Sequence, residues 1–434
     1  MEIKNVVIVD GMRSPFSWGG RGKFEATRID EVAAKVVRTL MARNPKVKPT
    51  KVEDFGIGCA GGGGDLVLLG AISRLAGLPA ETTSFHTNRQ CGSSMETMQR
   101  IAMSIMVGAM DCGIALGVER MGRSLAEGRG MVEPTRVTGL NPNIFEKSPL
   151  QRDMAHDHDT TFSVPIPDEI LDAPPMLPMT QTAQNVVDMY GLTKEELDAF
   201  TVRSHQKLTA AYAAGIYKDE VIPFEVENPV FDEKGRWIQE ETGEMMIFDR
   251  DECIRPECSM EGLAKLKPIK GLVSFMNKEV IITAGNSCPT NSGASAVLLM
   301  SEKMATQLGL EPLARIVGMG VGGVKGQLMG IGPIPATIRA MNHAGITADQ
   351  IDRVEFNEAF AAQVIPSIND LGIPEEKVNV NGGSLGIGHP LGATGARLVL
   401  TVAKELRRSG KRYGLATQCI GSGMGISTII EAMN

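Results

Sequence analysis

Short runs of apolar and β-branched residues alternate along this chain with longer stretches whose apolar residues recur at helical spacing. In the first third, the predicted strands and helices lie at residues 6–9, 29–41, 55–59, 66–75, 84–87, 95–106 and 113–118. In the last third, predicted strands lie at residues 314–317, 354–357, 378–381, 413–417 and 425–430, with helices between them. Strands that alternate with helices are typical of crossover connections, so we expect an α/β fold built around a parallel sheet.

These two regions also resemble each other in detail. In each, a helix is followed by Gly-x-Pro, at residues 77–79 and 372–374, then by a short strand and a glycine-containing turn. A chance likeness between two βα units is the alternative, but the preceding segments, 52–59 and 351–357, match as well. We therefore predict an internal duplication with two similar βαβ halves.

The middle of the chain has a different character. It contains two proline clusters, an acidic stretch and one clear amphipathic helix, at residues 165–167, 174–178, 153–159 and 194–214. This composition predicts a loop domain inserted into the first half. The predicted limits are residues 1–125 with 255–305 for the N-terminal half, 126–254 for the inserted domain and 306–434 for the C-terminal half. Segments 272–284 and 294–301 are predicted to supply the last strands of the first half.

Length and composition exclude several classes of protein. A chain of 434 residues is too long for one ordinary core, and its net charge of −7 argues against nucleic-acid binding as the main activity. The seven cysteines are scattered without a close CxxC pair, which favours a reducing cytoplasm over a disulfide framework. The sequence contains no apolar run of about 18 residues, so we expect no membrane span. The first residues also lack the pattern of a signal peptide. The acidic stretch matches no metal-ligand spacing, so we expect a solvated loop there and no metal site.

The strongest local signal for chemistry is Asn-Arg-Gln-Cys-Gly-Ser-Ser-Met at residues 88–95. Cys91 follows a predicted strand and precedes a predicted helix, whose inward stripe is expected to be Met95, Met98, Ile101, Ala102 and Ile105. A thiol in this place faces the free N–H groups and the positive dipole end of the helix, which favour the thiolate. Two interpretations of this segment alone stay open: a nucleophile, or a buried cysteine that packs as a small apolar residue.

Three further polar residues follow strands of the C-terminal half. His389 lies between glycine and proline in a glycine-rich run, which predicts a loop that backbone and substrate approach closely. Cys419 follows the strand at 413–417, and Asn357 ends another strand. Because the carboxyl ends of parallel strands are where α/β sheets place ligands, we expect these three residues and Cys91 to meet in one site.

In combination, these segments resemble the thiolase family of 3-ketoacyl-CoA and acetyl-CoA acyltransferases. The likeness extends nearly from end to end and includes segments 11–16, 88–95, 179–185, 203–207, 330–333 and 357–360, together with His389 and Cys419. The forms of segments 88–95 and 357–360 most resemble the thiolase subunit of bacterial fatty-acid oxidation. The resemblance implies a duplicated thiolase fold, layered α/β/α/β/α, with an inserted loop domain.

The resemblance implies that Cys91 attacks the 3-keto carbon of a 3-ketoacyl-CoA and carries the acyl group as a thioester. His389 would take the thiol proton, and Cys419 would protonate the departing acetyl-CoA enolate. Asn357 would hold a water that completes one oxyanion hole with His389, and the N–H groups of Cys91 and Gly421 would form a second. The reaction is reversible, so the same site would also condense acetyl-CoA to acetoacetyl-CoA.

Coenzyme A is implied as a co-substrate, with no permanently bound cofactor. The positions that correspond to the family's CoA and acyl contacts are Arg255, Met179, Met329, Phe360, Gly262 and Cys288. Gly262 and Cys288 stand where serines are usual, and Pro178 replaces a histidine, so CoA contacts and acyl preference are expected to differ. The implied partners are 3-ketoacyl-CoA, CoA, acetyl-CoA and further copies of this chain in a homodimer or homotetramer. Membership of a β-oxidation multienzyme complex is an open alternative.

Two other functions stay open at this point. A decarboxylating ketoacyl synthase shares the duplicated fold and the cysteine nucleophile, but it pairs that cysteine with two histidines or with histidine and asparagine. The second cysteine, Cys419, favours thiolase over this alternative. A non-catalytic CoA-ester-binding subunit would need no intact set of Cys91, His389 and Cys419.

Overall fold

The computed structural model describes residues 3–61, 69–121, 177–233, 235, 237–238 and 241–433. The segments 153–159 and 165–167, most of the proline cluster at 174–178 and the first part of the helix predicted at 66–75 lie outside these residues. The described helices are α1 (Ile29–Arg43), α2 (Leu69–Leu75), α3 (Ser93–Met106), α6 (Met179–Tyr190), α7 (Lys194–Ala213), α8 (Met260–Ala264), α9 (Glu302–Gln307), α10 (Pro333–Ala344), α11 (Ala361–Asp370), α12 (Ser384–Ile387) and α13 (Leu391–Ser409).

The described strands are β1 (Val6–Arg13), β2 (Ser17–Trp18), β3 (Asp54–Gly58), β4 (Thr83–Thr87), β5 (Cys112–Arg120), β6 (Phe224–Glu227), β7 (Met245–Phe248), β8 (Asn291–Ser301), β9 (Ala314–Gly323), β10 (Arg353–Phe356), β11 (Tyr413–Ile420) and β12 (Met424–Ala432). Short 3₁₀ helices connect some of them, at Pro49–Lys51, Ile216–Asp219, Gly326–Ile331, Ala348–Gln350 and Glu375–Lys377. The main sheet has the order β10-β11-β12-β9-β1-β8-β5-β3-β4, with β2 paired to β8, while β6 and β7 form a separate hairpin.

The two halves of the main sheet repeat the same strand order and the same directions. In the first half, β4, β3 and β5 are parallel, and β8 runs antiparallel to both β5 and β1. In the second half, β10 and β11 are parallel, and β12 runs antiparallel to both β11 and β9. Val378 makes a single parallel bridge to Val354 of β10, in the place that β4 occupies beside β3. A short antiparallel contact between β1 and β9 joins the halves.

Three features of the sheet differ from the sequence predictions. The sheet is mixed, because the last strand of each half is antiparallel to its neighbours. Residues 378–381 make only the Val378 bridge, and residues 272–284 contain no strand. In residues 272–284, side chains supply acceptors that a neighbouring strand would otherwise provide. The N–H groups of Val273 and Ile281 donate to the side-chain oxygens of Gln181 and Gln184, respectively, at 3.0 Å each. Both glutamines belong to α6.

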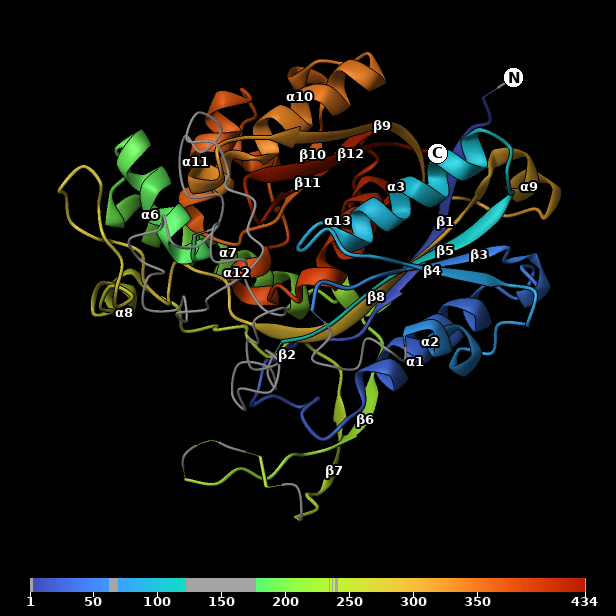
Figure 1. The fold of residues 1–434 in the computed structure, drawn as a ribbon, viewed down its shortest axis with the longest axis horizontal. Helices are drawn as coiled ribbons and strands as arrows, with labels where there is room; N and C mark the ends of the chain where they lie inside the picture. The colour runs from blue at the N-terminus through green and yellow to red at the C-terminus, as the bar shows by residue number, and fades with distance from the viewer. Residues whose placement is uncertain are drawn as a thin grey trace, which may run out of the picture.

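Helices α3 and α13 lie together in the middle of the molecule, between the strands of the two halves (Figure 1). The predicted inward stripe of α3 is confirmed, because Met95, Met98, Ile101, Ala102 and Ile105 are all fully buried in this middle layer. Ser94 Oγ accepts a hydrogen bond from the Ala396 N–H at 2.9 Å. A Cβ placed on Gly395 would lie 2.6 Å from the Met95 nitrogen, so the glycine is what permits this contact between helices.

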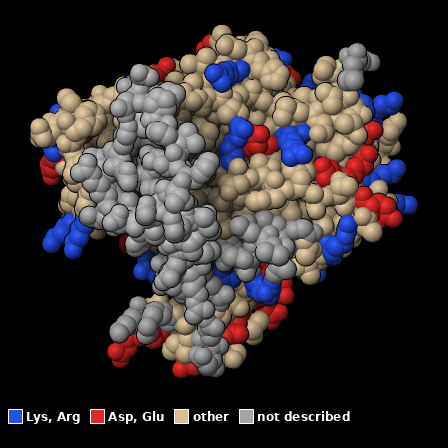
Figure 2. All heavy atoms as spheres, viewed as in Figure 1, with Lys and Arg blue, Asp and Glu red and all other residues tan. Residues whose placement is uncertain are grey.

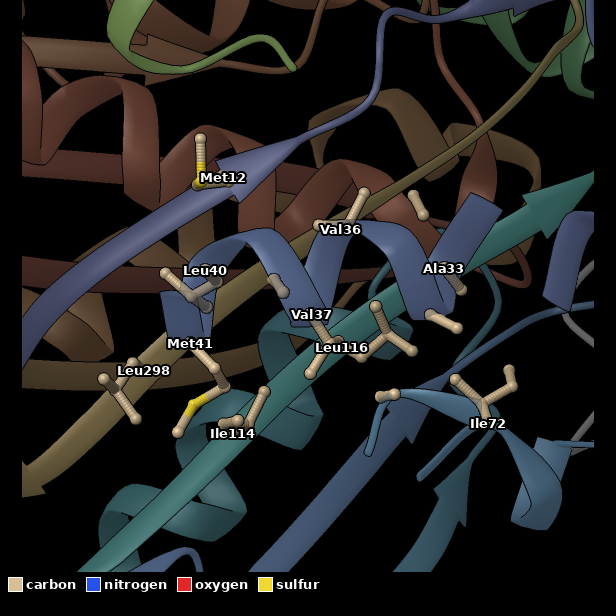
Figure 3. Packing of buried hydrophobic residues seen from close by; sticks show 14 of the residues in the cluster. Met12, Ala33, Val36, Val37, Leu40, Met41, Ile72, Ile114, Leu116 and Leu298 are labelled. Carbon is tan, nitrogen blue, oxygen red and sulfur yellow. The ribbon is translucent and has the colours of Figure 1, made fainter. Parts of the chain in front are cut away.

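Further helices cover the outer faces of the sheet. Helix α1 turns Ala33, Val36, Val37, Leu40 and Met41 toward β5 and β8, as Figure 3 shows. The second outer cluster contains residues of α6, α10 and α11 packed against β10 and β11. The order of layers from one outer face to the other is therefore helices, strands, helices, strands and helices (Figure 1).

The described surface has mixed charge. On the face in Figure 2, basic and acidic side chains lie near one another, and no broad field of either sign covers the described residues of that face. The described residues of this face therefore form no extended positive patch that would attract a polyanion. Among the described residues, no helix combines the length and the apolar character that a bilayer crossing requires.

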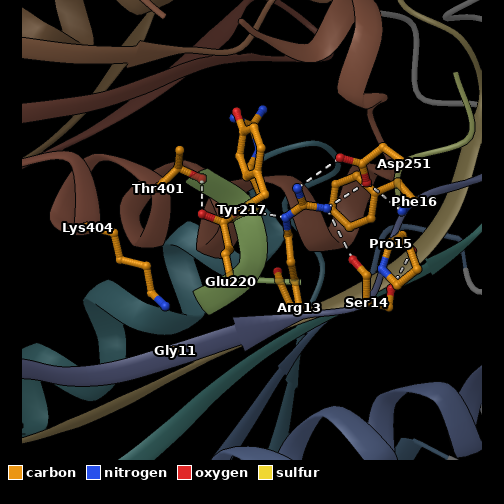
Figure 4. A network of polar contacts seen from close by, with 12 residues as sticks. Gly11, Arg13, Ser14, Pro15, Phe16, Tyr217, Glu220, Asp251, Thr401 and Lys404 are labelled. Carbon is orange, nitrogen blue, oxygen red and sulfur yellow. Dashed lines mark hydrogen bonds and ion pairs between the residues drawn. The ribbon is translucent and has the colours of Figure 1, made fainter. Parts of the chain in front are cut away.

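A buried ion network holds the end of β1 against two later segments and α13 (Figure 4). Arg13, which is fully buried, donates to both carboxylate oxygens of Asp251 at 2.7 and 2.9 Å and to Glu220 at 2.5 Å. Glu220 also accepts a hydrogen bond from the Thr401 hydroxyl of α13 at 3.0 Å. The network therefore ties chain segments together that are far apart in sequence.

Replacing Arg13 by methionine is expected to lower the stability by about 3–5 kcal/mol, because two carboxylates would be left buried without their cation. The midpoint of urea-induced unfolding measures the loss. Arg28→Met is the matched control, since Arg28 pairs with Asp30 but its side chain is 55% exposed, and exposed pairs contribute about 0–1 kcal/mol. An equal shift in both variants would show that the buried network adds no particular stability.

Candidate active site

A cavity of about 680 Å³ lies where the two halves and α6 to α8 meet. Nine of the residues singled out in the sequence line it: Cys91, Met179, Arg255, Gly262, Cys288, Met329, Phe360, His389 and Cys419. The other two predicted residues, Asn357 and Gly421, do not line the cavity but contact residues that do. The structure thus brings together residues that the sequence places far apart.

Cys91 lies in the turn between β4 and α3, and Gly92 is the N-cap of that helix. The turn is tight: Gln90 has a φ of 46°, and its N–H donates to Asn88 Oδ1 at 3.0 Å. The turn after β11 approaches from the other half so closely that a Cβ on Gly421 would lie 1.7 Å from Gln90 Oε1. The N–H groups of Gly421 and of Cys91 itself contact the thiol sulfur.

Burial raises the pKa of the Cys91 thiol to about 11, although hydrogen bonds from the Gly421 and Cys91 N–H groups act to lower it. The N–H groups thus act in the expected direction, but in the free enzyme the loss of hydration outweighs them. Near neutral pH the sulfur carries its proton. Nucleophilic attack then requires a base that removes the proton as the new bond forms.

His389 lies in the loop between α12 and α13 and lines the same cavity as Cys91. Burial, with a contribution from Arg397, lowers the pKa of its imidazole to about 3, so the ring is neutral near pH 7. Its Nδ1 lies 2.7 Å from Thr394 Oγ1, and its Nε2 lies 3.3 Å from Asn357 Nδ2. Its backbone N–H donates to Asn291 Oδ1 at 2.9 Å, which fixes the loop.

Cys419 lies near the end of β11, which extends to Ile420 and so includes the cysteine that was expected to follow the strand. Its thiol donates to Gln363 Oε1 at 3.2 Å, and Gln363 Nε2 donates to the Asn357 carbonyl at 2.9 Å. Burial and the neighbouring Cys91 raise the pKa of Cys419. A thiol that keeps its proton in this way is suited to donate it to a carbanion.

Some residues of the site gave no clear signal in the sequence. Gln363 and Asn291 hold Cys419 and the His389 loop through side-chain hydrogen bonds. Each lies close to a recognised motif, but a single amide residue has no periodicity or spacing that identifies it. At the mouth of the cavity, the guanidinium groups of Arg21 and Arg255 lie 4.6 and 5.7 Å from the centre of the Trp18 ring.

A protonated thiol, a neutral imidazole and a second thiol around one cavity define the site of a cysteine-dependent acyl-transfer enzyme. Among the described residues, no cluster of three or more histidine, cysteine or acidic side chains is arranged to hold a metal ion. The acidic stretch 153–159 lies outside them.

Comparison with known proteins gives the same class. Residues 6–303 match the N-terminal domain of thiolase, and residues 310–432 match its C-terminal domain. The 3-ketoacyl-CoA thiolases of Aliivibrio fischeri and of a Marinomonas species are 36% and 38% identical to the chain. These alignments cover 99% of this chain and 100% of the first relative, and 98% of both this chain and the second relative.

Solved structures agree. The acetyl-CoA acetyltransferase of Bacillus anthracis has a TM-score of 0.79 and 31% identity, and the alignment covers 100% of both chains. Human mitochondrial 3-ketoacyl-CoA thiolase in complex with CoA has a TM-score of 0.80 and 29% identity, over 99% of this chain and 98% of the other. The chain belongs to the thiolase family, and is an acyltransferase with the duplicated thiolase fold that the sequence predicted.

Proposed function

We propose that this enzyme is a 3-ketoacyl-CoA thiolase in which Cys91 carries the acyl group. The observation that supports this most is the convergence of Cys91, His389 and Cys419 on one cavity. Cleavage of the carbon–carbon bond releases the enolate of acetyl-CoA, which must be protonated, and a second thiol beside the nucleophile can supply that proton. The relatives named 3-ketoacyl-CoA thiolase support the same substrate class.

In the first stage, the Cys91 sulfur attacks the 3-keto carbon while His389 takes its proton. The bond between C2 and C3 then breaks, Cys419 donates its proton to C2, and acetyl-CoA leaves. The N–H groups of Cys91 and Gly421, which contact the sulfur in the free enzyme, are placed to stabilise the oxygen of the acyl-enzyme. Each such donor is worth roughly 2.7–4 kcal/mol in other enzymes.

Before the second stage, the proton on His389 returns to Cys419. In the second stage, His389 takes the proton of a free CoA thiol as its sulfur attacks the thioester carbon, and it returns that proton to the Cys91 sulfur as acyl-CoA leaves. Asn357 and His389 lie 3.3 Å apart. Once His389 has taken the Cys91 proton, it would donate to the thioester oxygen of the substrate together with a water held by Asn357, and the two would form an oxyanion hole. All steps are reversible, so abundant acetyl-CoA would drive condensation through the same groups. CoA is a substrate in both directions.

Incubation with acetyl-CoA is expected to add an acetyl group to the peptide that contains Cys91. The Cys419→Ala variant should form the same adduct, because transfer from a thioester needs no carbon acid. Its steady-state thiolysis should fall by about 10²–10⁴, the usual contribution of a general acid. Peptide mass spectrometry and a thiolysis assay measure the two stages.

Cys112→Ala serves as the control for that experiment, because Cys112 is fully buried in β5 and does not line the cavity. It should keep both stages. An acetyl group on Cys419 alone, or normal turnover by Cys91→Ala, would refute the proposed roles.

We assign the CoA nucleotide to the mouth of the cavity, where Arg255 is exposed beside Trp18 and Arg21. Guanidinium groups match the geometry and the charge of phosphates. The pantetheine arm then passes Gly262 and Cys288, and the acyl chain reaches Met179, Met329 and Phe360. Those roles follow from the family resemblance and from the place of each residue in the lining.

Arg255→Ala should raise the KM for CoA about tenfold and change kcat little, because a hydrogen bond to a charged group contributes about 1.5 kcal/mol or more. The effect should shrink as salt is added. Steady-state kinetics with CoA as the varied substrate measures it. Arg203→Ala is the control, since Arg203 pairs with Glu375 outside the cavity. An unchanged KM for CoA in Arg255→Ala would show that the nucleotide does not bind at the mouth of the cavity.

We also propose that the enzyme is a homo-oligomer in the cytoplasm. All seven cysteines are free thiols, which fits a reducing compartment. At one end of the main sheet, β4 pairs only with β3 among the described strands and is largely exposed. An open edge of this kind is a template for pairing with a second copy.

Ser84→Pro is expected to weaken that pairing without unfolding the sheet. The Thr83 N–H donates to Glu53 on the side of β3, so the next N–H along the strand, that of Ser84, points away from the sheet. Light scattering at micromolar concentration should give at least a dimer for the wild type and Ser84→Ala, and a smaller species for Ser84→Pro. A monomeric wild type with full activity would contradict the proposal.

A further inference from the structure

An unbroken chain of buried hydrogen bonds reaches the imidazole of His389 from Arg397 on α13. Arg397 Nη2 donates to Ser384 Oγ at 2.6 Å, and Ser384 Oγ donates to Asn357 Oδ1 at 2.6 Å. Asn357 Nδ2 then lies 3.3 Å from His389 Nε2. The first three residues are fully buried, so water does not compete for these contacts.

The polarity of this chain is fixed at Arg397, because a guanidinium has N–H donors and no acceptor. Ser384 Oγ must accept from it, which leaves the hydroxyl proton for Asn357 Oδ1. Rotating the Asn357 amide by half a turn would deprive that proton of its one acceptor among the described residues, at a cost of about 1–3 kcal/mol. Asn357 therefore presents its Nδ2 hydrogens to His389, and Nε2 must supply a lone pair.

The contacts of His389 Nδ1, on the other side of the ring, favour the same tautomer. Thr394 Oγ1 donates to the Pro390 carbonyl at 2.9 Å, one helical turn earlier. With its proton donated to that carbonyl, the hydroxyl is left to accept from His389 Nδ1, which lies 2.7 Å away. The proton of the neutral imidazole therefore lies on Nδ1.

We propose that Arg397, Ser384 and Thr394 are positioning residues that hold His389 in the tautomer with a proton on Nδ1 and a lone pair on Nε2, which accepts from Asn357 Nδ2 in the free enzyme. The proposal rests on the thiolase function proposed above, in which His389 takes the Cys91 proton. With Nδ1 turned to Thr394, Nε2 is the nitrogen left for that task. The opposite tautomer would present a proton where the thiol needs an acceptor.

The tautomer is measured directly by long-range ¹H–¹⁵N correlation NMR of the full enzyme labelled on its six histidines. The ring nitrogen coupled to both carbon-bound protons is Nε2, and it should show the shift of an unprotonated nitrogen. The His389 signal is assigned by its loss in His389→Gln. A protonated Nε2 in the wild type would overturn the proposal whether or not the enzyme is a thiolase.

Ser384→Ala should let the Asn357 amide rotate and move the proton toward Nε2. Acetylation of Cys91 by acetyl-CoA should then slow by about 10²-fold, within the range that a positioned general base contributes. Ser367→Ala is the matched control, because Ser367 is also fully buried but its hydroxyl has no hydrogen-bond partner among the described residues. It should keep the wild-type tautomer and rate.

Thr394 gives a second test that does not depend on how well Ser384→Ala folds. Thr394→Val has the same shape without the oxygen, so His389 should no longer keep its proton on Nδ1 and acetylation of Cys91 should slow. Thr394→Ser should restore the tautomer and the acetylation rate. If Ser384→Ala and Thr394→Val acetylate as fast as Ser367→Ala with His389 in the wild-type tautomer, the positioning role is refuted while the proposed function stands. If wild-type Cys91 acquires no acetyl group, the proposed function fails instead, and the NMR result still decides the tautomer.

Discussion

The close contact between α3 and α13 is the interaction on which the rest of the molecule depends. Each helix belongs to a different half, and each begins beside one of the proposed reacting groups, Cys91 before α3 and His389 before α13. Because Gly395 lies against the backbone of Met95, the two helix ends are brought to the same cavity. A wider separation would leave two intact half-sheets, with the proposed nucleophile and the proposed base too far apart to react together. The site is therefore a property of the interface between the halves, and neither half contains it alone.

The sequence predicted the parts of this arrangement that are local. The turn around Cys91, the loop around His389 and the buried stripe of α3 each have a signal within about ten residues, and the resemblance to a family joined them. The direction of β8 and β12 had no such signal, because a strand covered on both faces is a continuous apolar run whichever way it runs. Residues 272–284 were also predicted to carry a strand, yet the N–H groups of Val273 and Ile281 donate to glutamine side chains of α6. Hydrogen-bond partners that come from distant segments cannot be read from a single stretch.

Two fully buried arginines serve different purposes in this fold. Arg13 is surrounded by carboxylates and connects backbone segments, so its contribution is to stability. Arg397 pairs with Glu355 through one nitrogen and uses another to orient a serine hydroxyl. A permanent cation surrounded by side chains that can either donate or accept determines the direction of every hydrogen bond connected to it. Burial of the Arg397 charge therefore determines which atoms of the site carry protons, and it affects the stability of the fold only indirectly.

The burial of Cys91 has a consequence for the lifetime of the enzyme. Oxidants and stray electrophiles in the cell attack thiolates much faster than thiols. A sulfur that keeps its proton until a ketone or thioester lies against it is a poor target during the time between turnovers. Cys419, held protonated by the same loss of hydration, shares this resistance. Two buried thiols that keep their protons in one cavity are therefore less reactive toward oxidants than exposed thiolates.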